Sequence, residues 1–353
     1  MIKEGIKKLA EGLDLTYVEA REIMKEVMTG KATEAQLGAF LTALRMKGET
    51  VEEVTAFASV MREFCYKISP KVDGRLVDTC GTGGDKIKTF NVSTASAFVI
   101  SGAGIPVAKH GNRSVTSRCG SADVLERLGF NLDLEPKAVE RMIERVGIGF
   151  MFAPRFHPAM RYAVKPRREL GIRTVFNVLG PLTNPANVDA QVLGVYSGKW
   201  LKPVAYVLKN LGCKEAMVVY GLDGVDELSV TGKTLVAWLK DGEVAMMEVA
   251  PEKFGFRKAE PEEVRGLNPV ESGDLIFKLL NDRLSPRDPR RSMVLLNAAA
   301  GIVVGGKAES LAEGIEVAAE SIESGAAYRR LRDMVKASRG DLARLEELEA
   351  KYA

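Results

Sequence analysis

Residues 76–94 read LVDTCGTGGDKIKTFNVST, and this stretch decides how the chain folds. The apolar run that ends at Cys80 is typical of a buried strand, and the segment that follows Asn91 has helical spacing. Between them lies a loop with glycines at positions 81, 83 and 84. Glycine lets backbone amides approach an anion closely, and the start of a helix adds unpaired N–H donors. The stretch therefore predicts a strand, a phosphate-binding loop and a helix in succession.

This glycine loop differs from the common nucleotide-binding loops. The sequence contains no GxxxxGK[ST] motif, and Gly81-x-Gly83-Gly84 departs from GxGxxG. Nucleotide hydrolysis and dinucleotide redox chemistry are therefore disfavoured. The alternative is a structural role, in which the glycines supply the positive φ of a turn ahead of a Ser/Thr-capped helix.

Short apolar runs alternate with helix-like segments from about residue 70 onward, where the composition changes at Ser69-Pro70. The strand candidates after the glycine loop cover residues 105–109, 148–154, 190–197 and 215–221. Residues 234–249, TLVAWLKDGEVAMMEV, predict a hairpin that turns at Asp241-Gly242. The pattern predicts an α/β fold with a central mixed sheet flanked by helices, including C-terminal helices from about Lys307.

The first 65 residues have a different character. They contain three capping boxes, each ahead of an apolar-periodic run: Thr16 with Glu19, Thr33 with Gln36, and Thr50 with Glu53. Gly30 and Gly48 follow the first two runs, where helix-ending glycines belong. We expect a small helical domain over residues 1–70, rejoined by about 158–188, and a large α/β domain over 71–157 and 189–353.

Composition and charge exclude several classes of protein. The chain has 353 residues, 46% of them hydrophobic, and a net charge of +3, which does not favour a general nucleic-acid or membrane binder. The four cysteines lie far apart without a CxxC pair, which argues against a zinc site or a disulfide framework. The N-terminal stretch lacks an apolar signal core, and no run of about 18 apolar residues occurs. We expect a soluble, cytoplasmic protein.

A second polar loop, Lys109-His110-Gly111-Asn112-Arg113-Ser114, follows the strand candidate at residues 105–109. Loops at the carboxyl ends of strands gather around one crevice, so this loop and the glycine loop are expected to face the same ligand. Lys109 would balance phosphate charge. His110 is open to a structural or a functional role, and His157, in Phe156-His157-Pro158, to a hydrogen bond that holds its own loop.

Charged residues mark two further candidate positions. Arg167 precedes Leu170-Gly171 near the expected domain junction, where a guanidinium could hold a carboxylate in bidentate fashion or simply be solvated. Asp226 and Glu227 follow the strand candidate at 215–221, where two carboxylates could bind Mg²⁺ or form an acidic solvated turn.

The motifs GTGGD, NVST, KHGNRS, GSADVLERLG, FHPAM, PRRELGIRTVFNVLGPLTNP and DGVDELS occur in this order over nearly the whole chain. In this the chain resembles the anthranilate phosphoribosyltransferases. GTGGD is shared with the related pyrimidine nucleoside phosphorylases, whereas KHGN together with RRELG and NVLGPLTNP is specific to the anthranilate branch. The resemblance also implies the fold, a small helical domain hinged to a larger α/β domain.

The resemblance implies the site residues. Phosphoribosyl pyrophosphate would be held by Gly81, Thr82, Gly83, Gly84, Asp85, Thr89, Asn91, Ser93, Thr94, Lys109 and Ser121. Anthranilate would be held by Gly81, His110, Asn112 and Arg167, and Mg²⁺ by Ser93, Asp226 and Glu227.

The resemblance also implies the reaction, which transfers phosphoribose to the anthranilate amine with release of pyrophosphate, in tryptophan biosynthesis. We expect inversion at the anomeric carbon, with no enzyme nucleophile or general base, and a homodimer formed through the helical domain. Two rival functions are a pyrimidine nucleoside phosphorylase, which needs no carboxylate-binding Arg167, and a non-catalytic nucleic-acid-binding relative, which would need a basic surface stripe. The net charge of +3 and the intact acidic pair disfavour the second rival.

Overall fold

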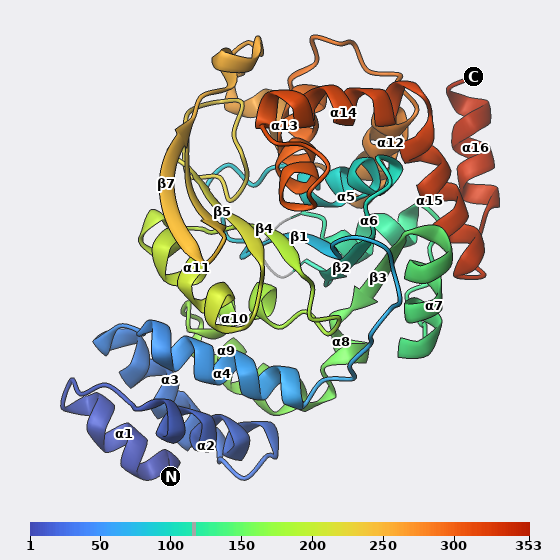
Figure 1. Cartoon of the computed structure of the whole chain (residues 1–353). Coiled ribbons are helices and arrows are strands. Elements are labelled where there is room, and N and C mark those ends of the chain that lie inside the picture. Colours follow the sequence, from blue (N-terminus) through green and yellow to red (C-terminus); the bar gives the residue numbers. More distant parts are fainter. Residues whose placement is uncertain (115–117) are drawn as a thin grey trace.

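A seven-stranded sheet lies at the centre of the larger part of the molecule, in the order β3-β2-β1-β4-β5-β6-β7 (Figure 1). The computed structural model describes residues 1–114 and 118–353. The strands are β1 (Val77–Gly81), β2 (Val107–Gly111), β3 (Ile148–Phe152), β4 (Ala190–Gly194), β5 (Glu215–Gly221), β6 (Thr234–Lys240) and β7 (Glu243–Val249). The first five in sheet order pair in parallel, and β6 and β7 are antiparallel, so the predicted mixed sheet is confirmed.

The β6–β7 hairpin turns at the two residues that the sequence predicts. Asp241 and Gly242 have φ values of 51° and 79°, which places both in the left-handed region. A two-residue turn of this kind matches the right-handed twist of the flanking strands and favours Asp-Gly.

Helices cover both faces of the sheet (Figure 1). One face packs directly against α5 (Val92–Gly102), α13 (Pro289–Val304) and α15 (Ala326–Ala337), and α7 (Pro136–Val146) packs against β3 at the edge of the sheet. Further out on this side lie α6 (Ser121–Arg127), α12 (Pro269–Leu280), α14 (Leu311–Glu323) and α16 (Ala343–Lys351). The other face packs against α11 (Leu201–Asn210), which in turn contacts the N-terminal helices. The helices predicted after about Lys307 are therefore present.

Alternating side chains in β5 divide the hydrophobic core between these two layers. Met217 and Val219 belong to the core on the α13 side, whereas Ala216 and Val218 belong to the core shared with α11. Successive side chains of a strand point to opposite faces, so a strand that is apolar at every position is buried on both sides.

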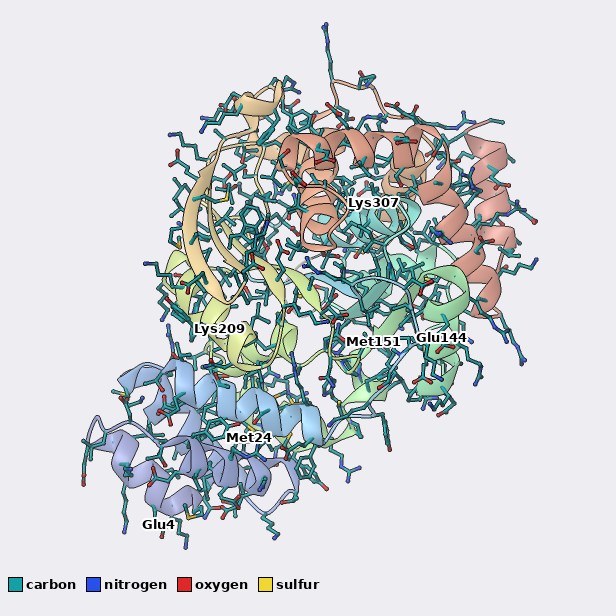
Figure 2. The ribbon with its side chains drawn as sticks, in the orientation of Figure 1. Glu4, Met24, Glu144, Met151, Lys209 and Lys307 are labelled. Carbon is teal, nitrogen blue, oxygen red and sulfur yellow. The ribbon has the colours of Figure 1, made fainter. Side chains whose placement is uncertain are left out.

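Four helices form the N-terminal bundle: α1 (Ile2–Ala10), α2 (Tyr17–Met28), α3 (Glu34–Lys47) and α4 (Val51–Glu63). The three predicted capping boxes are present, with both reciprocal hydrogen bonds in each, at the starts of α2, α3 and α4. The capping patterns do not predict α1, because its first turn has no side-chain cap. Figure 2 shows Met24 of α2 inside this bundle and Met151 of β3 inside the α/β part, and both side chains are fully buried.

Residues 158–188, which we call the return segment, bring the chain back to the N-terminal bundle. Its helices are α9 (Arg161–Leu170) and α10 (Phe176–Leu182), reached through the short α8 (Ala153–Phe156). Helix α9 contacts α2 and α3, and α10 contacts α4. The Lys165 ammonium lies 2.5 Å from a Glu34 carboxylate oxygen, and the Arg62 Nε donates to the Leu182 carbonyl at 2.8 Å. These contacts agree with the expected return to the helical part, whose boundaries stay a prediction.

Within residues 1–114 and 118–353, no helix is long and apolar enough to cross a membrane. No disulfide joins the four cysteines in the part of the chain that the structure describes.

Candidate active site

Loops at the carboxyl ends of β1, β2 and β5 meet at one edge of the sheet. We call residues 81–85 the glycine loop and residues 223–227 the acidic loop. The Gly83 N–H donates to Asp226 Oδ2 at 2.7 Å, and the Lys86 N–H donates to the Gly224 carbonyl at 3.0 Å. The structure thus brings together two candidate loops that lie far apart in the sequence.

The acidic loop lies so close to the strand ends that two positions there accept only glycine. A Cβ on Gly81 would lie 2.4 Å from Asp226 Oδ2, and a Cβ on Gly194 would lie 1.5 Å from the Asp226 carbonyl oxygen. Contacts this short would displace the acidic loop. Gly194, at the end of β4, has no distinguishing mark in the sequence.

The acidic loop concentrates unfavourable negative charge. Burial, together with the nearby Asp85 carboxylate, raises the pKa of Asp226 to about 6. Burial and repulsion from Asp226 raise the pKa of Glu227 well above its ordinary value, although Lys109 and the Ser93 N–H partly offset this effect. Lys109 therefore offsets the charge of Glu227, whereas Asp85 and Asp226 add repulsion, and oxygen donors with excess negative charge suit a hard divalent cation.

Ser93, Asp226 and Glu227 fit a Mg²⁺ ion in donor type and charge. In the described residues there is no cluster of three or more His, Cys, Asp or Glu side chains that could hold a metal. A cation here would therefore also need water or substrate oxygens, as Mg²⁺ usually does.

Lys109, near the end of β2, lies beneath the glycine loop. It is 3% exposed, and its ammonium donates to the Thr79 carbonyl at 2.6 Å and to the Ser93 hydroxyl at 3.3 Å. Burial lowers the pKa of Lys109, while the Asp78 carboxylate favours the charged form. The lysine thus holds positive charge between β1 and the start of α5.

The start of α5 presents polar atoms that lack a protein partner. Asn91 is the N-cap residue, and its amide nitrogen donates to the Cys119 carbonyl at 3.1 Å. Among the described residues, Asn91 Oδ1 and Thr94 Oγ1 are buried without a hydrogen bond. Buried polar atoms are normally satisfied, so these two positions suit a ligand with hydroxyl or phosphate groups.

The remaining predicted phosphate-side residues border the same loops. The Thr82 hydroxyl accepts from the Tyr196 N–H at 2.9 Å, and Asp85 Oδ2 accepts from the Thr89 N–H at 3.2 Å. The Ser121 hydroxyl donates to the carbonyl of Asn112 at 3.3 Å, at the start of α6. The Asn112 side-chain oxygen accepts from its neighbour's backbone N–H, so in this structure it is occupied locally.

His110 and His157 form a buried pair, with ring centroids 5.0 Å apart. Burial lowers the pKa of His110 well below its ordinary value and that of His157 to about 4. The rings face the backbone carbonyls of Gly180 and Thr183, and neither Nε2 has a hydrogen-bond partner among the described residues. Both imidazoles are therefore neutral, and each presents an open acceptor. No local pattern in the sequence predicts this pairing.

Arg167 is a half-buried cation on α9, and this helix continues through Pro166. Its guanidinium carbon lies 5.1 Å from the Phe176 ring centroid. Among residues 1–114 and 118–353 it makes no hydrogen bond or ion pair, and burial lowers its pKa. An unpaired guanidinium in partly buried surroundings is a suitable binding group for a carboxylate.

The buried carboxylate of Asp78 accepts hydrogen bonds from several of the segments that form the candidate site. Asp78 Oδ2 accepts from the amides of Asn184 at 2.8 Å and Gln191 at 3.3 Å, and Oδ1 accepts from the His110 N–H at 3.3 Å. No role was predicted for Asp78, Asn184 or Gln191. An aspartate inside the otherwise apolar run at 76–80 was the available signal, because charged side chains are rarely buried unless they are paired.

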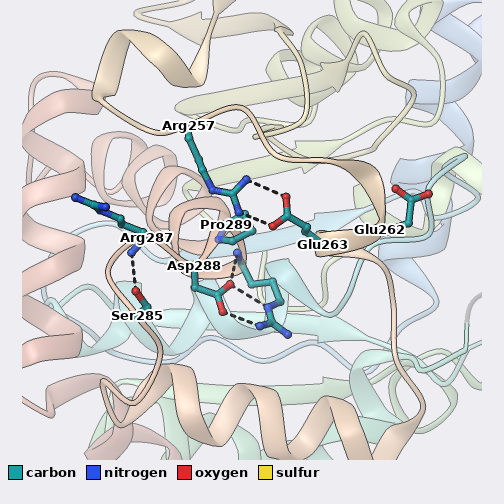
Figure 3. Close-up of a pocket in the computed structure, with 8 residues that line it drawn as sticks. Arg257, Glu262, Glu263, Ser285, Arg287, Asp288 and Pro289 are labelled. Atoms are coloured by element: carbon teal, nitrogen blue, oxygen red, sulfur yellow. Dashed lines mark hydrogen bonds and ion pairs between the residues drawn. The ribbon is translucent and has the colours of Figure 1, made fainter.

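A surface hollow of about 480 Å³ lies apart from this site, at the start of α13 (Figure 3). Its charges are mostly satisfied locally, since Arg257 pairs with Glu263 and Arg290 pairs with Asp288. None of the predicted site residues lines it. The hollow is therefore not the candidate active site.

Two family descriptions match the chain. "Glycosyl transferase family, helical bundle domain" matches residues 3–65, and "Glycosyl transferase family, a/b domain" matches residues 73–328. The first match spans the N-terminal bundle, and the second runs from just before β1 into α15, so it includes the return segment.

Similar proteins agree with this result. An anthranilate phosphoribosyltransferase from Methanocorpusculum labreanum is 52% identical over 96% of this chain and 99% of its own length. A second, from Pelotomaculum thermopropionicum, is 52% identical over 95% of this chain and 96% of its own length. The crystal structure of the Thermus thermophilus protein of that name has a TM-score of 0.89 at 41% identity, covering 95% and 99% of the two chains. The Saccharomyces cerevisiae structure, a complex with phosphoribosyl pyrophosphate and magnesium, has a TM-score of 0.88 at 28% identity, covering 96% and 98%.

Proposed function

The chain belongs to the anthranilate phosphoribosyltransferase family, and on that premise we propose that it transfers phosphoribose from phosphoribosyl pyrophosphate to the amine of anthranilate. This reaction releases pyrophosphate and belongs to tryptophan biosynthesis. The proposal is supported by two sets of groups: the buried carboxylates of the acidic loop beside the glycine-loop amides, and the unpaired Arg167 guanidinium together with the open Nε2 atoms of His110 and His157. The first set suits a metal-bound pyrophosphate, and the second suits an aromatic carboxylate with an amine.

On the phosphate side, the glycine loop and the start of α5 would bind the ribose donor. The proposed residues are Gly81, Thr82, Gly83, Gly84, Asp85, Thr89, Asn91, Ser93, Thr94, Lys109 and Ser121. The unpartnered polar atoms of Asn91 and Thr94 support this assignment. Ser93, Asp226 and Glu227 would hold Mg²⁺, which would relieve the repulsion between the buried carboxylates.

On the anthranilate side, we assign Gly81, His110, Asn112 and Arg167, and we add His157. Arg167 would bind the carboxylate, and the open Nε2 atoms of the histidine pair would accept hydrogen bonds from the amine. For Asn112 to contact substrate, its side chain must release the backbone N–H that it now accepts from.

Catalysis then depends on charge and position. Magnesium, when bound, supplies positive charge that stabilises the leaving pyrophosphate. The amides of the glycine loop and the Lys109 ammonium face the same growing charge. The anthranilate amine is neutral near pH 7, so it attacks without prior deprotonation, and Arg167 and Asn112 contribute by positioning. Attack opposite the leaving group inverts the anomeric carbon.

The helical part is proposed as the dimer interface of a cytoplasmic homodimer, with domains over residues 1–70 plus about 158–188, and 71–157 plus 189–353. The exposed apolar side chains of the bundle include Leu13 at 50%, Val18 at 68% and Met46 at 83%. Exposed apolar groups of this size suit an interface between copies. Sedimentation of the wild-type protein and of Met46→Glu would test it, since a dimer through this surface should dissociate in the variant.

The test of function is the loss of anthranilate fluorescence when purified protein meets phosphoribosyl pyrophosphate, first with magnesium and then with excess chelator. We expect a loss that requires magnesium. No loss, together with phosphate-dependent cleavage of thymidine or uridine, would assign the chain to the phosphorylases. No activity in either assay would favour a non-catalytic role.

A further inference from the structure

Arg173 lies in the turn between α9 and α10 and reaches across to the glycine loop. Its guanidinium Nη2 donates to the Gly84 carbonyl at 2.7 Å, and its guanidinium carbon lies 4.5 Å from the Tyr196 ring centroid. Tyr196 follows β4, and its N–H donates to the Thr82 hydroxyl at 2.9 Å. One arginine of the return segment thus contacts the glycine loop directly and also packs against the ring of Tyr196, whose backbone N–H is bonded to that loop.

Gly84 is suited to this contact. Its φ is 78°, and a Cβ at this position would lie 3.3 Å from Arg173 Nη2, so the missing side chain lets the guanidinium approach the backbone. In a planar trans peptide the carbonyl and the next N–H point in opposite directions. Holding the Gly84 carbonyl therefore also fixes the direction of the Asp85 N–H.

The same turn leads directly from Arg167. Gly171 has a φ of 62°, and its N–H donates to the Arg167 carbonyl at 3.4 Å. The Thr174 N–H donates to Asn177 Oδ1 at 2.9 Å, just beyond Arg173. The backbone between the two arginines is held at both ends. A ligand bound to Arg167 would therefore restrain the turn that carries Arg173.

We propose that Arg173 is a positioning residue that couples the two sides of the site, so that occupancy of the anthranilate side strengthens binding at the glycine loop. The inference rests on the proposed function, because it takes Arg167 as the carboxylate-binding group and the glycine loop as the pyrophosphate-binding group. A ligand that orders the return segment reduces the freedom that the glycine loop must still lose when its own ligand binds. The coupling is reciprocal, so phosphoribosyl pyrophosphate strengthens carboxylate binding by the same factor.

The test measures the affinity of phosphoribosyl pyrophosphate with magnesium by calorimetry, with and without saturating benzoate. Benzoate has the carboxylate of anthranilate but lacks the amine, so no transfer occurs. For the wild-type protein we expect benzoate to strengthen binding by about five-fold or more. In Arg173→Ala we expect this coupling factor to fall to about one.

Three further variants separate coupling from charge and from folding. Arg168→Ala removes a nearby exposed arginine that forms no hydrogen bond or ion pair in the described parts of the chain, and it should keep the wild-type factor. Arg173→Lys keeps the charge without the planar fork, and Tyr196→Leu removes the stacking ring, so both should lose coupling. Tyr196→Leu also serves as the test if Arg173→Ala does not fold.

Three results would overturn the inference: an unchanged factor in Arg173→Ala, full coupling in Arg173→Lys, or no coupling in a wild-type protein that turns over anthranilate. The first result would show that Arg173 does not contribute to coupling. The second would show that only its positive charge matters, and not the planar guanidinium. A folded wild-type protein without transferase activity would instead refute the proposed function, which keeps the two failures distinct.

Discussion

The two proposed sides of the site carry unbalanced charge of opposite sign. The proposed phosphate side holds the carboxylates of Asp85, Asp226 and Glu227 close together, and the Lys109 ammonium offsets only part of the repulsion at Glu227. The anthranilate side holds a guanidinium without an acid and two imidazoles with open Nε2 atoms, as judged from the described residues. The groups on the two proposed sides therefore suit different ligands, a cation on one side and a carboxylate with an amine on the other.

The largest expected effect comes from removing the excess charge. Asp226→Asn combined with Glu227→Gln should lower kcat/KM by about 1,000-fold, because the donors for the cation and the charge stabilisation at the leaving group are lost together. The fluorescence assay over a range of magnesium concentrations measures this. Glu262→Gln, which changes an exposed acid at the distant hollow, is the control. Magnesium-stimulated turnover that persists in the double variant would remove the acidic pair from the metal site.

The same charge should cost stability in the metal-free protein. The folded pKa of Asp226, about 6, lies above its ordinary value of 3.8, so folding favours the protonated form. At neutral pH this corresponds to a destabilisation of up to about 3 kcal/mol. Asp226→Asn should therefore raise the free energy of unfolding while it lowers activity.

The sign of this effect gives a pH test. Below about pH 4 the Asp226 carboxyl is protonated in both states, so variant and wild type should differ little. As the pH rises from about 4 to about 6, the unfolded state loses its proton first, and the stability advantage of Asp226→Asn should grow and then level off. Urea unfolding at several pH values measures the difference. A variant that is less stable than wild type at neutral pH would show that the carboxylate is satisfied by partners other than an added cation.

On the anthranilate side, the role of the Arg167 guanidinium is tested by its effect on KM for anthranilate. Arg167→Ala should raise KM for anthranilate by about 10- to 100-fold, the range expected for a lost hydrogen bond to a charged group. KM for phosphoribosyl pyrophosphate should change less. Steady-state kinetics with Arg168→Ala as the matched control separates the lost contact from lost charge. Equal effects on both substrates would contradict the assignment of Arg167.

The smallest expected effect concerns the histidine pair. With His110 held well below its ordinary pKa and His157 at about 4, both rings stay neutral near pH 7, so kcat/KM should show no inflection near pH 6.5. His157→Asn should raise KM for anthranilate by about 3- to 10-fold through loss of one neutral acceptor. An inflection near pH 6.5 that disappears in His157→Asn would show instead that this ring titrates in the free enzyme.

Local patterns predicted much of the fold and the position of the glycine loop between β1 and α5. The capping boxes at Thr16, Thr33 and Thr50 depend on residues three apart, and the Asp241-Gly242 turn depends on two neighbours, so the sequence contains the whole interaction. The glycine loop is likewise one continuous segment.

Individual side-chain contacts between distant segments were not predicted. The Asp78–Asn184 bond joins residues 106 apart, and it forms because β1 lies between β2 and β4 in the sheet. The His110–His157 pair also depends on spatial order, since β2 pairs with β3 and the chain beyond β3 leads to His157. The period of the apolar residues and the composition predict where strands occur, but they do not predict the order of the strands in the sheet. The supporting side chains therefore became visible only in the structure.

The return segment has a consequence for synthesis on the ribosome. Arg62 of α4 donates to the Leu182 carbonyl, 120 residues further along the chain, and α9 and α10 contact helices made much earlier. The N-terminal helices emerge first but cannot complete their packing until the first three strands of the sheet have also been made. The N-terminal helices therefore finish folding only after residues 158–188 have been made. Until then their apolar faces are exposed, and chaperones protect surfaces of this kind.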